Sequence, residues 1–153
     1  IEKLEELQRH LMLFFTGFSR IASEIAIEQI KNIPQNKKEL IAISGMVDEA
    51  VSILNSKDDI CKLGELLHES WKIKRNLADK ISSSHINQIY DDAISAGAKG
   101  GKLLGAGGGG FMLIFAQPQD QPRIKEKLKN LLLVPCQFES AGSQIVVYHP
   151  NGL

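Results

Sequence analysis

A run of glycines near residue 100 is the feature of this sequence most able to take part in chemistry. The stretch GGKLLGAGGGGF spans residues 100–111, and eight of the chain's 13 glycines fall between residues 97 and 110. Glycine loses more conformational entropy on folding than any other residue, so we expect such a cluster to have a structural or chemical role that offsets this cost. Its backbone can approach a phosphate, a sugar or another chain segment where any Cβ would clash.

The place of these glycines in the chain argues against the two commonest phosphate-binding loops. A Rossmann or Walker loop follows a strand and opens a helix, whose N-terminus then faces the phosphate. Here a predicted helix ending near Gly97 precedes the glycines, the strand FMLIFA follows them, and the Gly-Lys-Ser/Thr ending is absent. Two interpretations remain: a device for close packing, or a surface for a substrate or for the phosphate loop of a neighbouring domain. The four consecutive glycines 107–110 favour the second, because one tight turn requires fewer.

Three basic residues are candidates for binding an anion. Lys74 lies on the apolar stripe of a predicted helix, directly before Arg75. That stripe consists of Leu63, Leu67, Trp71, Lys74 and Ala78. Arg20 falls in the first turn of another predicted helix, where the macrodipole disfavours a cation unless an anion is bound nearby. For each of the three, the alternative is a solvated side chain at the edge of the core.

The other polar residues form no recognisable catalytic or metal-binding set. The four histidines are scattered, and no Ser/His/Asp or Cys/His arrangement accompanies them. Cys61 and Cys136 lie in segments of different character and are expected to be reduced thiols.

The composition is that of an ordinary globular domain. The 153 residues suffice for one sizeable core, and 18 basic residues balance 18 acidic ones, so nothing favours a nucleic-acid partner. No apolar run approaches the roughly 20 residues that cross a membrane, and the acidic start is no signal peptide, so a cytoplasmic protein is expected. Because the chain does not begin with Met, we expect a piece of a longer protein.

Hydrophobic periodicity predicts the elements that position these residues. Strands are expected at 11–17, 111–116, 133–138 and 143–149, the last two forming a hairpin around 139–142. Helices are expected at 20–32, 37–54, about 59–78, 84–97 and 123–132. Because strands and helices do not alternate strictly, the pattern favours an α+β fold, with a helix layer against a mostly antiparallel sheet.

Taken together, four segments resemble the C-terminal domain of GHMP-superfamily small-molecule kinases. They are FFTGFSRIAS (14–23), LGELLHESWKIKRNL (63–77), IYDDAISAGAKGGKLLGAGGGGFMLIF (89–115) and the closing hairpin. KLLGAGGGGF is similar to the third motif of that superfamily. The combination of TGFSR, W-x-x-K-R and the glycine segment resembles the branch that phosphorylates the anomeric hydroxyl of a heptose 7-phosphate. The resemblance covers nearly the whole chain.

The resemblance implies one domain over residues 1–153 with a ferredoxin-like α+β fold. It also implies a missing N-terminal half carrying the phosphate loop, the magnesium ligand and the catalytic residue, so no catalytic or metal-binding residue is expected in this chain. The complete enzyme would use ATP and Mg²⁺ and would supply heptose for lipopolysaccharide in the cytoplasm. This chain alone is expected to bind neither cofactor and to be inactive.

The resemblance also suggests roles for individual residues. Three loop residues would pack beside the phosphate loop of the missing half: Gly105, Ala106 and Gly110. Three others would lie against the sugar: Gly107, Gly108 and Gly109. Three cations would bind the phosphate that the sugar already carries: Arg20, Lys74 and Arg75. Two alternatives stay open, namely a GHMP kinase acting on fucose, galactose or mevalonate, and a non-catalytic α+β binding module whose glycines serve only packing.

Overall fold

A four-stranded antiparallel sheet organises the part of the chain that the computed structural model describes, which is residues 2–17, 22–139 and 141–145. The strands are β1 (Leu11–Phe15), β2 (Gly100–Leu103), β3 (Phe111–Phe115) and β4 (Leu132–Val134). Their order in the sheet is β2-β3-β1-β4, with helices between β1 and β2 and between β3 and β4. This is the β-α-β-β-α-β arrangement of a ferredoxin-like fold. The prediction of an α+β fold with a mostly antiparallel sheet is confirmed.

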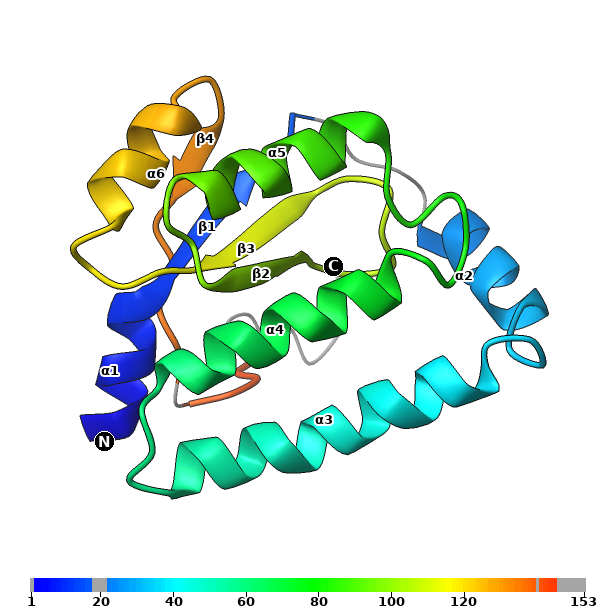
Figure 1. Ribbon diagram of the computed structural model, residues 1–153, viewed down its shortest axis with the longest axis horizontal. Helices are drawn as coiled ribbons and strands as arrows, with labels where there is room; N and C mark the ends of the chain where they lie inside the picture. Colours follow the sequence, from blue (N-terminus) through cyan, green and yellow to red (C-terminus); the bar gives the residue numbers. More distant parts are fainter. Residues whose placement is uncertain (1, 18–21, 140, 146–153) are drawn as a thin grey trace, which may run out of the picture.

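Helices cover one face and one edge of this sheet (Figure 1). Within the described residues they are α1 (Glu2–His10), α2 (Ala22–Lys31), α3 (Lys37–Asn55), α4 (Cys61–Lys74), α5 (Ser84–Ser95) and α6 (Gln121–Lys127). Helix α4 runs beside the edge strand β2, and α3 packs on the outer side of α4. Because α4 covers this edge, the unpaired backbone groups of β2 are not offered to another chain.

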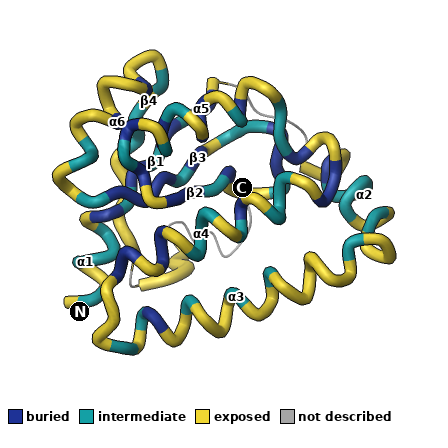
Figure 2. Tube along the Cα trace, in the orientation of Figure 1, coloured by how far each residue is buried: buried dark blue, intermediate teal, exposed yellow. Residues whose placement is uncertain are grey.

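The main core lies between the sheet and α5. Strand β1 alternates buried and half-buried residues, so Met12 and Phe14 face the same side of the sheet. Met112 and Ile114 of β3 continue that buried surface. The helix residues that pack on it include Trp71, Ile86, Ile89, Tyr90 and Ala93. These buried segments gather in the centre of the molecule (Figure 2).

Helix α3 is the most exposed of the longer helices (Figure 2). Ile53 is buried against α4, whereas the apolar residues Ile41, Val47 and Val51 are exposed. Apolar residues of α3 therefore also lie outside the side that packs against α4. No helix in the described ranges is both long and apolar enough to cross a membrane.

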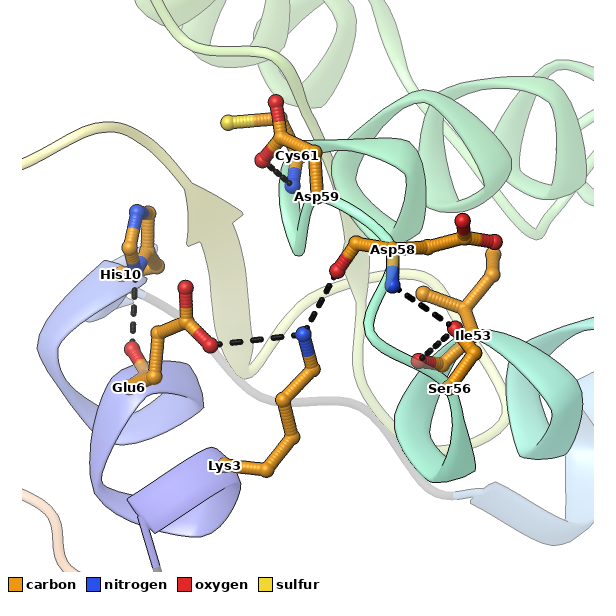
Figure 3. Close-up of polar contacts among 8 residues, drawn as sticks. All are labelled: Lys3, Glu6, His10, Ile53, Ser56, Asp58, Asp59 and Cys61. Atoms are coloured by element: carbon orange, nitrogen blue, oxygen red, sulfur yellow. Dashed lines mark hydrogen bonds and ion pairs between the residues drawn. The ribbon is translucent and has the colours of Figure 1, made fainter.

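Helix α1 is hydrogen-bonded to the connection between α3 and α4 (Figure 3). The Nζ of Lys3 donates to the backbone oxygen of Asp58 at 2.7 Å and forms an ion pair with Glu6 at 3.4 Å. At the start of α4, Oδ1 of Asp59 accepts a hydrogen bond from the N–H of Cys61 at 2.9 Å, which lowers the pKa of Asp59. The N-cap position of α4 is the next residue, Ile60, whose side chain makes no capping hydrogen bond.

The sequence prediction is wrong in several segments, and the helix expected at 123–132 ends at Lys127, before β4 begins at Leu132. The sequence predicts a loop at residues 100–103, whereas these residues form β2, in which Gly100 pairs with Phe115 of β3. The strand expected at 133–138 ends at Val134, because Pro135 has no N–H to donate to a neighbouring strand. Residues 143–145 are not a strand, and the remainder of that predicted strand lies outside the described residues. The charged segment before β1 forms α1.

Candidate functional site

The glycine loop, residues 105–110, joins β2 to β3. The N–H of Leu104 donates to the oxygen of Phe111 at 2.8 Å and closes the hairpin just before the loop begins. Residues 107–110 all have positive φ angles, at 122°, 77°, 157° and 103°. Residues other than glycine rarely adopt such φ angles. The loop therefore needs glycine for its backbone conformation as well as for close approach to other groups.

Gly107 packs directly on the segment between α4 and α5. A Cβ at this position would lie 2.8 Å from both the Cα and the carbonyl oxygen of Ile81. The next N–H, that of Gly108, donates to the same Ile81 oxygen at 2.8 Å. The backbone of the loop therefore packs directly against the backbone of Ile81.

Three further residues hold the loop by its carbonyl oxygens. The Nζ of Lys74, at the end of α4, donates to Gly105 O at 2.7 Å. The Nε2 of Gln29, on α2, donates to Ala106 O at 2.7 Å. Thr16, directly after β1, donates to Gly110 O through its N–H at 2.8 Å and through its hydroxyl at 3.0 Å. The glycine loop is thus an ordered backbone ribbon held from several elements.

Positive charge gathers beside this ribbon. Burial and the nearby charge of Lys102, on β2, lower the pKa of Lys74. Within the described residues, neither lysine has a carboxylate within ion-pair distance. Two uncompensated cations close enough to repel one another favour an anion between or beside them.

The other predicted cations are not seen to join this cluster. Arg75 lines a separate polar pocket with Asn76, Asp79, Ser82, Asn87 and Asp91. Successive helical residues point about 100° apart, so Lys74 and Arg75 face different surroundings although they are adjacent. Arg20 lies outside the described residues. Of the predicted site residues, the structure brings together Lys74 and the glycine loop.

Aromatic packing fixes α4, and with it Lys74. Trp71 is fully buried, and its ring centroid lies 6.1 Å from that of Tyr90 on α5. The Tyr90 hydroxyl is 2.7 Å from Nδ1 of His68, and burial raises the pKa of this tyrosine. Because His68 and Trp71 are both on α4, these contacts hold the helix that carries Lys74 against α5.

The sequence does not reveal the other residues that hydrogen-bond to the loop. Gln29 and Thr16 contact backbone atoms 77 and 94 residues away, and such contacts leave no local pattern. Nothing in the sequence sets Lys102 apart from the glycine stretch that contains it. GGKL has no β-branched or aromatic residue to mark it as a strand, so the sequence does not show which way Lys102 faces.

The lysines and free N–H groups of the site favour an anion, and the described ranges contain no cluster suited to a metal ion. No group of three or more His, Cys, Asp or Glu side chains there could hold a metal ion. Cys61 is buried and free, and burial raises the pKa of its thiol, which keeps it protonated. The arrangement therefore offers backbone N–H groups and ammonium groups for positioning.

Comparison with known proteins identifies relatives of this chain. The chain is 31% identical to D-glycero-alpha-D-manno-heptose 7-phosphate kinase of Campylobacter jejuni, over 82% of this chain and 37% of that protein. It is 30% identical to mevalonate kinase of Pyrococcus horikoshii, over 84% of this chain and 40% of that protein. The chain thus spans about two fifths of the length of these relatives.

The fold is shared with solved kinases. The structure of L. major mevalonate kinase in complex with R-mevalonate superposes with a TM-score of 0.69 at 21% identity, covering 80% of this chain and 40% of that one. The family described as GHMP kinases C terminal matches residues 49–132, which is more than half of the chain and includes the whole glycine loop. The chain therefore belongs to the GHMP kinase C-terminal family.

Proposed function

We propose that this chain is the substrate-side domain of an ATP-dependent sugar kinase that phosphorylates the anomeric hydroxyl of a heptose 7-phosphate. The observation that carries the proposal is the glycine loop with Lys74 and Lys102 beside it and no carboxylate paired with either in the described residues. A substrate that already bears a phosphate supplies the missing negative charge. The 31% identity to the Campylobacter kinase supports the choice of sugar.

In this proposal the sugar lies against residues 107–109 of the loop. The phosphate loop of an N-terminal half packs beside Gly105, Ala106 and Gly110, where Gly105 and Gly110 have open space at the Cβ position. ATP, bound with Mg²⁺ by that half, supplies the transferred group. Phosphoryl transfer depends mainly on positioning and charge stabilisation, which matches a site of N–H groups and cations. We place this reaction in the cytoplasm, as a step toward lipopolysaccharide heptose.

A mevalonate kinase is the second candidate, because the Pyrococcus relative is almost as similar at 30% identity. Mevalonate carries no phosphate before the reaction. The uncompensated lysines beside the loop are therefore better explained by the heptose substrate.

The proposal is tested by assaying the complete protein with ATP and each candidate acceptor. We expect turnover of heptose 7-phosphate and a kcat/KM at least about 100-fold lower for mevalonate, fucose and galactose, since the site would leave its cations unpaired. A higher kcat/KM for any of these three would overturn the heptose proposal.

The 153-residue chain by itself is expected to show no kinase turnover. Without the phosphate loop, nothing positions the γ-phosphate for transfer. The measurement is ATP consumption by the purified chain with heptose 7-phosphate, alongside the complete protein as a positive control. Turnover by the chain alone would contradict the assignment of catalysis to the missing half.

Replacing Lys74 or Arg20 by alanine in the complete enzyme is expected to raise KM for the sugar phosphate by about 10- to 100-fold, the loss typical of one hydrogen bond to a charged group. KM for ATP should change by less than about threefold. Lys72→Ala is the control, since Lys72 is exposed on the same helix and paired with Glu69. Equal increases in both KM values would argue against binding of the sugar's own phosphate.

A further inference from the structure

The loop carbonyls are held by side chains from two different helices. Lys74 of α4 donates to Gly105 O, and Gln29 of α2 donates to Ala106 O, each at 2.7 Å. These are consecutive residues, so two successive peptide groups are fixed at the start of the glycine loop. Gln29 is half-buried and uncharged, and its contact crosses 77 residues of sequence.

Fixing a carbonyl also fixes the N–H of the same peptide group. No cis peptide bond occurs in the described residues, and in a trans peptide the C=O and the following N–H point in opposite directions. The N–H groups of Ala106 and Gly107 therefore point away from Lys74 and Gln29. Neither has an acceptor within the described part of the chain, whereas the N–H groups of Gly108 and Gly110 are taken by Ile81 and Thr16.

We propose that Gln29 is a positioning residue, which acts with Lys74 to aim the N–H groups of Ala106 and Gly107 at a phosphate oxygen. This inference rests on the proposed function, in which the loop faces phosphate. A glycine-rich backbone is otherwise free to rotate, and an N–H that must be oriented anew for each substrate stabilises the transition state less than a fixed one.

Removing the donor of Gln29 tests the positioning role without removing a positive charge from the site. Lys74 brings an ammonium group whose loss alters both the loop and the electrostatic field, so its variants combine two effects. Gln29→Met keeps the length and most of the volume of the side chain but removes the donor. Gln29→Glu keeps the shape and sets a second acceptor oxygen against Ala106 O.

The experiment compares these two variants with wild type in the complete enzyme, with Gln88→Met as the control. Gln88 is an exposed glutamine on α5 whose Nε2 bonds only to Asp92. We expect Gln29→Met to lower kcat by about 10- to 100-fold, because small misplacements of a positioning group have effects of that size. KM for both substrates should stay within about threefold, and Gln29→Glu should lower kcat further.

Amide hydrogen exchange supplies a readout independent of any substrate. Residues 104–111 should exchange faster in Gln29→Met than in wild type or Gln88→Met, while the melting temperature stays close to that of the control. Unchanged exchange together with unchanged kcat would overturn the inference, as would a rise in KM alone. If the wild-type enzyme prefers an acceptor other than heptose 7-phosphate, only the proposed substrate fails, and kcat is compared with that acceptor.

Discussion

Replacing Gly100 by alanine is expected to destabilise the domain by about 3 kcal/mol, at the upper end of the cost of overpacking. A Cβ on Gly100 would overlap the carbonyl oxygen of Gly64 and lie 2.8 Å from the backbone nitrogen of His68. Both atoms belong to the backbone of α4, which cannot rotate aside as a side chain can. The helix would have to move away from the edge of the sheet, and Lys74 would move with it.

Chemical denaturation of the wild type and the variant measures this effect. Gly45→Ala is a matched control, because Gly45 lies within α3 and a Cβ there would have no neighbour within 4 Å. That change is expected to stabilise the domain by about 0.5–1 kcal/mol, since alanine loses less backbone entropy in a helix. A Gly100→Ala domain as stable as wild type would show that α4 and β2 are not in backbone contact.

Replacing Gly107 by alanine is expected to lower kcat/KM of the complete enzyme at least about 100-fold. The φ angle of 122° is unfavourable for alanine, and the new Cβ would lie 2.8 Å from the Ile81 backbone. Relieving this clash lifts the loop from its seat and breaks the hydrogen bond from Gly108 N–H to Ile81 O, which measures 2.8 Å. The N–H groups that we propose to face a phosphate would then lose their fixed direction.

Steady-state kinetics with the acceptor that the wild type prefers provide the measurement. Gly142→Ala is the control, because Gly142 also has a positive φ, of 66°, but a Cβ there would meet nothing within 4 Å. Its kinetics should match the wild type. Retention of more than half of the activity by Gly107→Ala would mean that the close approach to Ile81 is unnecessary for catalysis.

The sequence predicts those parts of the fold that rest on local patterns. The apolar run of β1 and the periodicity of α3, α4 and α5 identify these elements because burial of one side is written into successive residues. Strand β2 has no such signal, since GGKL contains no β-branched or aromatic residue. It becomes a strand by pairing with the next strand, β3, and by packing Gly100 against α4, and neither contact shows in its own four residues.

The candidate site, like the fold, is only partly visible in the sequence. The glycine cluster and the lysine on the Trp71 stripe are visible in the sequence, and the structure places Lys74 on the loop. The side-chain contacts that aim the loop are not visible, because Gln29 and Thr16 donate to backbone oxygens that any residue would present. The sequence also does not show that Lys74 contacts the loop while Arg75 lines a separate polar pocket, because this depends on how α4 lies in the fold.

The position of β1 in the middle of the sheet has a consequence for synthesis on the ribosome. Its partners are β3, about 100 residues later, and β4, later still. At about 5–20 residues per second, the first pairing must wait roughly 5–20 seconds while Leu11–Phe15 remains an unpaired apolar segment. The hairpin of α3 and α4, whose contacts are local, can form meanwhile. Within this sheet, the strand that is synthesised first therefore stays unpaired the longest, and during this interval its apolar residues are open to aggregation.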